Sequence, residues 1–302
     1  MTSLFGTEII HRLDLDPTVR PRLLAVFAHP DDEAFGSGGT LALYSWAGAA
    51  VYLVCTTGGE AGIIDPEFLA RYGTARAVRV AELQCAARKL GLAEVEVLGY
   101  RDSGMEGAPD NQHPHALVQA PLDTLAAQIT QTIRRVRPQV VLTFDPIGGY
   151  RHPDHIATHL AAVRAFHAAG DATISDPAGL PAYQPQKLYY VVFPRLLLRL
   201  FVKLMPFFGK DPRRFGRNHD LDLTRLVDTS FPVHARIDYR VVARQRAAAV
   251  QCHASQIVNP TLAQSVLGLL SRLLAGGETF MQAVPEPPTR VQRDLFAGVV
   301  VD

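Results

Sequence analysis

Short apolar runs alternate with stretches of helical periodicity over the first half of the chain. Strands are expected at 23–28, 51–56, 94–98 and 140–144, where apolar residues cluster between turn signals. Helices are expected after residue 39 as far as Trp46, and then over 74–90, 122–136 and 155–168. Because strands that alternate with helices favour parallel pairing, the pattern predicts a mostly parallel, doubly wound α/β sheet.

The alternation weakens after residue 170. The elements expected there are strands at 188–193 and 231–237 and a helix at 239–256, and 260–282 stays unassigned. The chain has no repeat, no low-complexity run and no clear linker. We therefore expect one α/β domain over residues 1–302, with a Rossmann-like core at about 22–170 and a C-terminal extension of extra strands and helices over 171–302.

Composition narrows the classes of function. Of the 302 residues 48% are hydrophobic, and 30 Lys and Arg against 29 Asp and Glu give a net charge of +1. A balanced chain has no basic field for nucleic acid, so nucleic acid is not expected as a partner. The cysteines, Cys55, Cys85 and Cys252, are odd in number and form no CxxC pair. They predict no disulfide framework and a reducing, cytoplasmic location.

The most apolar stretch, 191–208, is interrupted by Pro194 and Pro206 and carries a basic residue every four positions. A transmembrane helix is therefore not expected there. We favour an amphipathic helix of about three turns with a solvated basic stripe. The alternative is a contact with a membrane surface or an acidic substrate. The polar, basic loop expected at 210–220 follows it, and the role of 191–220 stays open.

Two motifs carry the candidate chemistry. The first, Ala28-His29-Pro30-Asp31-Asp32-Glu33, follows the first expected strand. The second, Gly149-Tyr150-Arg151-His152-Pro153-Asp154-His155, follows the strand at 140–144. Each could simply start a helix, because Pro favours the first helical position and acids favour the first turn.

Three observations favour chemistry over two plain helix starts. Both motifs follow apolar strands, and parallel sheets bind ligands at the carboxyl ends of their strands. Both place histidine where capping alone would favour Ser, Thr, Asp or Asn. Together they offer nitrogen and oxygen ligands suited to Zn²⁺ or a related divalent ion: His29, Asp31, Asp32, Glu33, His152, Asp154 and His155. A catalytic zinc needs about three protein ligands, so the surplus leaves groups for acid–base work.

The paired motifs resemble those of the LmbE/PIG-L family of zinc-dependent N-acetylglucosamine deacetylases. The likeness continues through 57–62, 79–83, 101–105 and 253–256, and it covers about 22–170 well and the remainder loosely. Within the family the chain looks closest to the mycothiol- and bacillithiol-pathway deacetylases, which act on GlcNAc joined to inositol or malate. The resemblance implies a metal-dependent hydrolase that removes the N-acetyl group of such a small molecule, releasing acetate and a glucosamine.

The resemblance also assigns roles to the motif residues. Three would hold the zinc, with Fe²⁺ as the alternative ion: His29, Asp32 and His155. Asp31 would be the general base for the attacking water, and a protonated His152 would stabilise the oxyanion. Asp154 would orient a histidine of its own motif. Either Asp31 or His152 would then return a proton to the departing amine.

Three residues are expected to contact the substrate: Arg79, Asp102 and Tyr150. For Arg79 the competing interpretation is a surface ion pair with Glu82, worth roughly a few tenths of a kcal/mol. For Asp102 it is a solvated turn, and for Tyr150 it is ordinary packing. His159 lies one helical turn after the second motif, but the family pattern does not use it as a ligand.

Other functions compete with this one. They are a deacetylase of another N-acetylated sugar, a deacetylase of a GlcNAc-lipid at a membrane surface, a nucleotide-binding enzyme such as a sugar transferase, and a non-catalytic sugar-binding relative. The transferase needs a phosphate-binding loop, and the glycines at 36–39 lack the spacing of one. The expected partner is a small N-acetylated sugar. Membrane contact is not favoured, and a homo-oligomer stays open.

Overall fold

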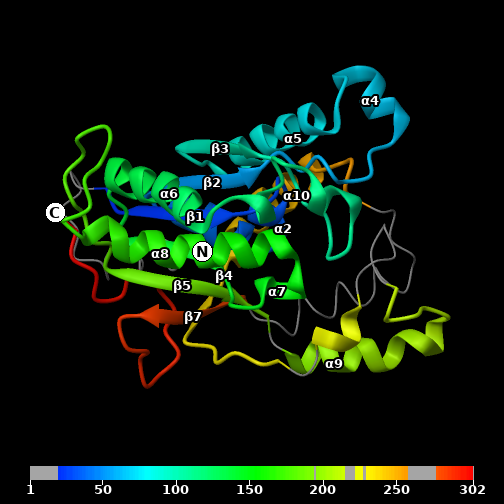
Figure 1. The fold of residues 1–302 in the computed structure, drawn as a ribbon. Coiled ribbons are helices and arrows are strands. Elements are labelled where there is room, and N and C mark those ends of the chain that lie inside the picture. The colour runs from blue at the N-terminus through cyan, green and yellow to red at the C-terminus, as the bar shows by residue number, and fades with distance from the viewer. Residues whose placement is uncertain (1–19, 194, 215–221, 227–228, 258–276, 302) are drawn as a thin grey trace.

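A mixed sheet with helices on both faces forms the core of the protein (Figure 1). The computed structural model describes residues 20–193, 195–214, 222–226, 229–257 and 277–301. Its strands are β1 (Arg22–Phe27), β2 (Ala50–Thr57), β3 (Glu94–Tyr100), β4 (Val140–Phe144), β5 (Lys187–Val192), β6 (Ala235–Ile237) and β7 (Glu278–Val284).

The described helices are α2 (Asp32–Phe35), α3 (Gly38–Trp46), α4 (Pro66–Tyr72), α5 (Ala75–Leu90), α6 (Leu122–Val136), α7 (Gly148–Arg151), α8 (Pro153–Gly170), α9 (Arg195–Leu204) and α10 (Ala243–Cys252). Short 3₁₀ turns lie at Pro109–Gln112, Leu117–Gln119, Met205–Phe208, Leu223–Leu226 and Arg240–Val242.

The order of the strands determines where a ligand can bind. They follow one another as β3-β2-β1-β4-β5-β7-β6, and β1 to β5 pair in parallel. β7 runs antiparallel to both β5 and β6. The predicted mostly parallel, doubly wound α/β sheet is therefore confirmed. The winding reverses between the neighbouring strands β1 and β4, and open α/β sheets bind ligands at such a reversal.

The central strand β1 is buried on both faces, which explains its unbroken apolar sequence. Leu23, Ala25 and Phe27 pack into the core beneath α3, α5 and α10. Leu24 and Val26 pack into the opposite core beneath α6 and α8. Because alternate side chains of a strand point to opposite faces, β1 contributes apolar side chains to the cores beneath both helical layers.

Local sequence signals predict the first half of the fold well. α6 and β4 have the predicted bounds, and α5 begins after Thr74, whose hydroxyl accepts from the N–H of Ala77 at 3.1 Å. α8 begins at Pro153, two residues before the expected start, because proline is well suited to the first helical position. The loop expected at 99–120 contains two 3₁₀ turns.

The second half departs further from the expected elements. The strand expected at 231–237 is confirmed only over its last three residues, and the helix expected at 239–256 contains a 3₁₀ turn before the shorter α10. β7 begins in the unassigned segment and ends two residues beyond it, and its place depends on pairing with β5 and β6 rather than on a local pattern. α9 has about the length predicted and ends before Pro206. Within the described ranges, no helix is long and apolar enough to cross a membrane.

A carboxylate from β7 caps the N-terminus of α3. Glu278 accepts hydrogen bonds from the N–H groups of Gly39 and Thr40 at 2.9 and 2.7 Å. Ser37, at the capping position, makes no side-chain bond of its own to the helix. A negative group at a helix N-terminus satisfies free N–H groups and favours the helix dipole. The C-terminal extension thus stabilises a helix of the core.

The expectation of no disulfide is wrong. Cys85 on α5 and Cys252 at the end of α10 are bonded, 167 residues apart in sequence, with Cα atoms 5.7 Å from each other. Cys55 is free and buried. The sequence gives no sign of this bond, because the bond depends on α5 and α10 lying side by side on one face of the sheet.

Replacing Cys85 and Cys252 by serine should lower the free energy of unfolding by about 2–5 kcal/mol, because the bond closes a long loop in the unfolded chain. Denaturant unfolding under oxidising conditions measures this difference. Reductant should produce a similar loss in the wild type and none in the double variant. Equal stability of the two oxidised proteins would contradict the bond.

Candidate metal centre

The two motifs meet at the carboxyl ends of β1 and β4. The chain leaves β1 after Phe27, and α2 begins at Asp32 within the first motif. In the second motif His152 caps α8, with its Nδ1 accepting from the N–H of Asp154 at 3.2 Å. Both motifs therefore do start helices, as the simpler interpretation expects. The side chains at these starts nevertheless converge on one buried point.

The three predicted ligands lie near the spacing of a tetrahedral ion. Nδ1 of His29 is 3.1 Å from Nε2 of His155. Oδ1 of Asp32 is 3.4 Å from that Nε2, and Oδ2 of Asp32 is 3.7 Å from that Nδ1. Tetrahedral zinc with bonds of about 2.0–2.1 Å separates its ligand atoms by about 3.3–3.4 Å. The donor set and its spacing fit such an ion.

The outer nitrogens of His29 and His155 carry protons that they donate to hydrogen bonds, which leaves the lone pairs on the two nitrogens that face each other. Nδ1 of His155 is 3.2 Å from the carbonyl oxygen of Gly148, which only accepts, so this nitrogen carries the proton. Nε2 of His29 is 3.1 Å from Asp154 and 3.4 Å from Asp102, so it also donates. The remaining nitrogens face each other, and two lone pairs at this distance need a cation or a proton between them.

The carboxylates and rings of the centre shift one another's pKa values in a direction that favours a positive charge between the two histidines. Burial alone would lower the pKa of His29, but Asp102, Asp154 and Asp32 raise it well above its usual value. Burial and the charge on His29 lower the pKa of His155 well below its usual value. Burial raises the pKa of Asp32 to about 7, although His29 opposes this. A proton on His29 thus occupies the place that suits a metal cation.

Asp154 has a different partner from the one expected. Its Oδ2 contacts Nε2 of His29, in the other motif, and accepts from the N–H of Ser103 at 2.9 Å. The expectation that it orients a histidine of its own motif is therefore wrong for the carboxylate. The reason is that the chain between β1 and α2 brings the ring of His29 over the first turn of α8. A carboxylate behind a ligand histidine fixes its tautomer.

His152 lies at the edge of the centre and is neutral. Its ring packs against His29 with centroids 4.5 Å apart, and one ring nitrogen from each of His29, His152 and His155 lies within 4.8 Å of the other two. Burial and the charge on His29 lower the pKa of His152 to about 3. This direction favours the neutral ring, whereas the family resemblance implies a protonated one. Because Nδ1 accepts from a backbone N–H, the neutral ring keeps its proton on Nε2.

Asp31 lies beside the centre in an unusual backbone conformation. Its φ is 130°, a value rare for any residue but glycine. Its Oδ2 accepts from the guanidinium of Arg79 at 2.8 Å, and its N–H donates to Glu33 at 2.9 Å. Burial raises the pKa of Asp31, while Arg79 opposes the rise. The carboxylate is held in place and is accessible enough to meet a ligand.

Arg79 lies beneath the site rather than on its surface. Its NH2 group also donates to the carbonyl oxygen of Pro30 at 2.6 Å, and its side chain is 5% exposed. A Cβ at Gly59, where φ is +72°, would fall 2.5 Å from this guanidinium, so only glycine leaves room for it. The competing surface pair with Glu82 is wrong, because Glu82 is buried and bonded to Ser255.

The other two predicted contacts also lie close to the ligands. Asp102 is buried, and its Oδ1 accepts from the N–H of Gly104 at 2.9 Å. Its competing interpretation as a solvated turn is therefore wrong. Tyr150 packs edge-on to His155 with centroids 4.8 Å apart, and its hydroxyl is 3.5 Å from Nε2 of that histidine. Tyr150 therefore borders the space where a ligand of the metal would lie.

Two further residues lie at the site, and the family resemblance assigns neither of them a role. Glu33 belongs to the first motif but matches no assigned chemistry, and His253 lies 220 residues further along. They are hydrogen-bonded to each other. His159 donates to the carbonyl oxygen of Phe144 at 2.8 Å, which agrees with its omission from the ligands. No local pattern in the sequence identifies the Glu33–His253 pair.

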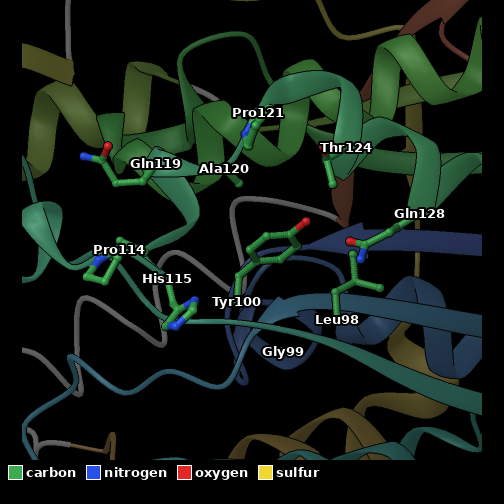
Figure 2. Close-up of a pocket in the computed structure, with 11 residues that line it drawn as sticks. Leu98, Gly99, Tyr100, Pro114, His115, Gln119, Ala120, Pro121, Thr124 and Gln128 are labelled. Atoms are coloured by element: carbon green, nitrogen blue, oxygen red, sulfur yellow. The ribbon is translucent and has the colours of Figure 1, made fainter.

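A separate cavity of about 320 Å³ lies beside the end of β3 (Figure 2). Figure 2 shows Tyr100 and Leu98 on one side and residues from the start of α6 on the other. Its lining includes none of the predicted site residues. We therefore assign the chemistry to the metal centre and not to this cavity.

Comparison with known proteins agrees with the motifs. The family model described as GlcNAc-PI de-N-acetylase, PIG-L, matches residues 24–166. The 1D-myo-inositol 2-acetamido-2-deoxy-alpha-D-glucopyranoside deacetylase of Geodermatophilus obscurus is 39% identical over 295 residues, covering 92% of this chain and 98% of that one.

Solved structures share the fold. The N,N'-diacetylchitobiose deacetylase from Pyrococcus horikoshii aligns with a TM-score of 0.61 at 19% identity, covering 96% of this chain and 97% of that one. The 4-carboxy-2-hydroxymuconate hydratase GalB of Pseudomonas putida KT2440 aligns with a TM-score of 0.56 at 20% identity, covering 89% and 99%. Because a hydratase shares it, the fold alone does not define the reaction.

The ligand assignment predicts one zinc ion per chain, bound in the wild type and lost in Asp32→Ala and His155→Ala. Asp154→Asn should weaken zinc binding about 10–100-fold, because the partner of a ligand histidine is changed. Metal analysis after dialysis and calorimetric titration measure both effects.

His159→Ala is the matched control, since this histidine lies on α8 one turn from a ligand and should leave the zinc content unchanged. His152→Ala should also keep one ion. Full zinc content in His155→Ala would contradict the assignment, and loss of zinc in His152→Ala would make His152 a ligand.

Proposed function

The chain belongs to the PIG-L family of de-N-acetylases, and on this premise we propose that it hydrolyses the acetamide of a GlcNAc joined to inositol. The products are acetate and a free glucosamine. The relative from G. obscurus, named for a GlcNAc-inositol substrate, supports this choice because the likeness extends over nearly the full length of both chains. The observation that carries the proposal is the pair of facing imidazole nitrogens 3.1 Å apart, in a centre whose first motif also supplies Asp31, a carboxylate held by Arg79.

The residues of the centre suit a bound zinc ion. His29, Asp32 and His155 would hold it, and Fe²⁺ is the alternative. A divalent ion there lowers the pKa of a bound water and polarises the acetyl carbonyl. Asp154 and Asp102 hold Nε2 of His29, so the opposite nitrogen keeps its lone pair for the metal.

Asp31 acts as the general base. Arg79 holds its Oδ2, which leaves Oδ1 to take the proton of the attacking water. Burial raises the pKa of Asp31 toward the range in which a carboxylate is an effective base near neutral pH. The same carboxylate then carries the proton that the departing amine requires.

His152 stabilises the charge that develops on the acetyl oxygen. With Nδ1 accepting from the backbone, its Nε2–H is available as a donor in the neutral ring. A neutral imidazole placed in this way can donate to an oxyanion without titrating. Its low pKa makes it a poor source of the second proton, so we assign proton return to Asp31.

Of the three residues predicted to contact the substrate, one borders the metal centre and two are buried behind it. Tyr150 borders the metal centre, and we propose it as the direct contact to the acetyl group. Arg79 and Asp102 are buried against protein groups, so we propose that they affect the substrate through Asp31 and His29.

The cytoplasmic location stays a prediction. It is based on the expectation of no disulfide, and the Cys85–Cys252 bond removes that support. The homo-oligomer likewise stays open.

The substrate assignment predicts release of free amine from GlcNAc-inositol at a higher kcat/KM than from GlcNAc-malate or N,N'-diacetylchitobiose. Fluorescamine detection of the amine across this panel measures it. Chelation should abolish release, and added Zn²⁺ or Fe²⁺ should restore it. Preference for another member of the panel would overturn the inositol assignment, and no amine from any member would overturn the deacetylase proposal.

Loss of the base should slow the reaction without loss of the metal. Asp31→Asn is expected to lower kcat by about 10²–10⁴-fold, with little change in KM and in zinc content. Asp123→Asn is the matched control, because it neutralises an exposed carboxylate on α6. Full activity of Asp31→Asn would exclude Asp31 as the base.

A further inference from the structure

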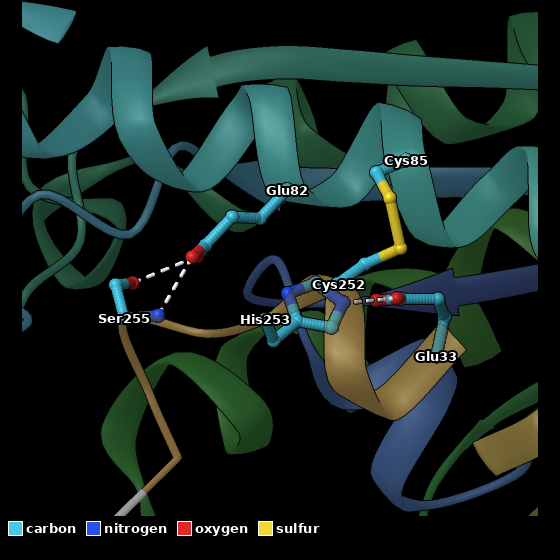
Figure 3. Close-up of a disulfide and its surroundings, with 6 residues drawn as sticks. All are labelled: Glu33, Glu82, Cys85, Cys252, His253 and Ser255. Carbon is cyan, nitrogen blue, oxygen red and sulfur yellow. Dashed lines mark hydrogen bonds and ion pairs between the residues drawn. A yellow bond between two sulfur atoms is a disulfide. The ribbon is translucent and has the colours of Figure 1, made fainter. Parts of the chain in front are cut away.

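A buried chain of hydrogen bonds joins the residues after α10 to the backbone of Asp31. Glu33 lies at its centre: its Oε1 is 2.7 Å from Nε2 of His253, as Figure 3 shows, and its Oε2 accepts from the N–H of Asp31 at 2.9 Å. Glu33 and His253 are both wholly buried. Since the carboxylate accepts at both oxygens, Nε2 of His253 is the donor.

This chain acts on the strained residue of the site. A φ of 130° costs a non-glycine residue about 1–3 kcal/mol and persists only where the surroundings enforce it. The hydrogen bond to Glu33 fixes the peptide plane before Asp31, and the φ of 130° then sets the direction of the Cα–Cβ bond. Glu33 on the backbone and Arg79 on the side chain together determine where the carboxylate lies.

The residues around His253 are themselves anchored to α5 at two points (Figure 3). Cys252 is bonded to Cys85, and both the N–H and the hydroxyl of Ser255 donate to Glu82 at 2.7 Å. The same helix carries the guanidinium that holds the carboxylate of Asp31. The backbone of Asp31, through Glu33 and His253, and its side chain, through Arg79, are thus both held by groups attached to α5.

We propose that Glu33 and His253 are positioning residues of the deacetylation, which hold the backbone of Asp31 so that its carboxylate keeps its place beside the metal ligands. The inference rests on the proposed role of Asp31 as the base. Neither residue has to touch the substrate or the metal, so their loss should lower kcat and leave KM and zinc content nearly unchanged. A displacement of about 1 Å at a reacting group can cost up to about 100-fold in rate.

Two variants at His253 test whether its side chain must reach Glu33 with a hydrogen-bond donor. The amide nitrogen of glutamine reaches about as far as Nε2 of histidine, whereas that of asparagine is one methylene shorter. His253→Gln should keep kcat within about 3-fold of the wild type, and His253→Asn should lower it about 10–100-fold. Both substitutions are polar and similar in size, so a difference between them reports the bond to Glu33.

A second pair tests the acceptor. Glu33→Gln keeps a carbonyl oxygen for the Asp31 N–H, and its amide can donate to His253 if that ring moves its proton to Nδ1. It should keep most of kcat, whereas Glu33→Leu should lose about 10–100-fold. In the Asp31→Asn background neither His253→Asn nor Glu33→Leu should lower the residual rate further, because residues that act through one group are not additive.

Hydrogen exchange of the Asp31 amide gives a readout independent of turnover. It should be at least about 10-fold faster in His253→Asn than in His253→Gln, since the loss of a hydrogen bond of about 1.4 kcal/mol changes an opening equilibrium tenfold. Tyr44→Phe is the control for stability alone, because it removes a buried bond to Asp294 far from the site. It should keep the wild-type kcat.

The outcomes separate this inference from the proposed function. Wild-type release of amine tests the proposed function by itself, and the exchange measurement does not depend on it. Equal kcat and equal exchange in the Gln and Asn variants would overturn the positioning role. A further loss of rate in the Asp31→Asn background would also overturn it, because the residues would then act by another route.

Discussion

The close approach of two imidazole nitrogens is the constraint on which this site depends. Nδ1 of His29 and Nε2 of His155 lie 3.1 Å apart because each ring is held from behind, by Asp154 and by the carbonyl oxygen of Gly148. Asp102, Asp154 and Asp32 raise the pKa of His29, so they favour a positive charge at this point. The neighbouring strands β1 and β4 enforce the approach, so the stability of the sheet helps to maintain a polar cluster that a metal would neutralise.

The sequence predicts those parts of the molecule that depend on local patterns. The unbroken apolar residues of β1, the helical period of α6 and the two motifs at strand ends all reflect short-range rules, and their positions in the sheet follow from the parallel alternation. β7, the Cys85–Cys252 bond and the Glu33–His253 contact each join segments distant in sequence. Their formation depends on strand pairing for β7 and on how helices pack on one face for the other two, and no local pattern in the sequence encodes either.

Burial changes the chemistry that motif residues perform. The sequence favours a protonated His152 because the usual pKa of histidine is near working pH. In the folded protein, burial and a positively charged neighbour lower this pKa to about 3. The neutral ring can still donate through Nε2, so the proposed contact with the oxyanion does not require the expected charge. Similarly, Arg79 has the residue type of a sugar contact but is buried beneath Asp31. The residue types of His152 and Arg79 indicate that both lie at the site, whereas their burial determines which contacts they make.

The C-terminal extension contacts both the candidate metal centre and the core. The family model ends at residue 166, yet His253 is bonded to Glu33 of the first motif, and Glu278 caps α3 from β7. The disulfide adds a covalent tie between the two parts. These three ties support the prediction that residues 1–302 form one domain. They also imply that changes in the extension can affect the metal centre without touching it, since the strained backbone of Asp31 is held partly by a residue beyond the shared motifs.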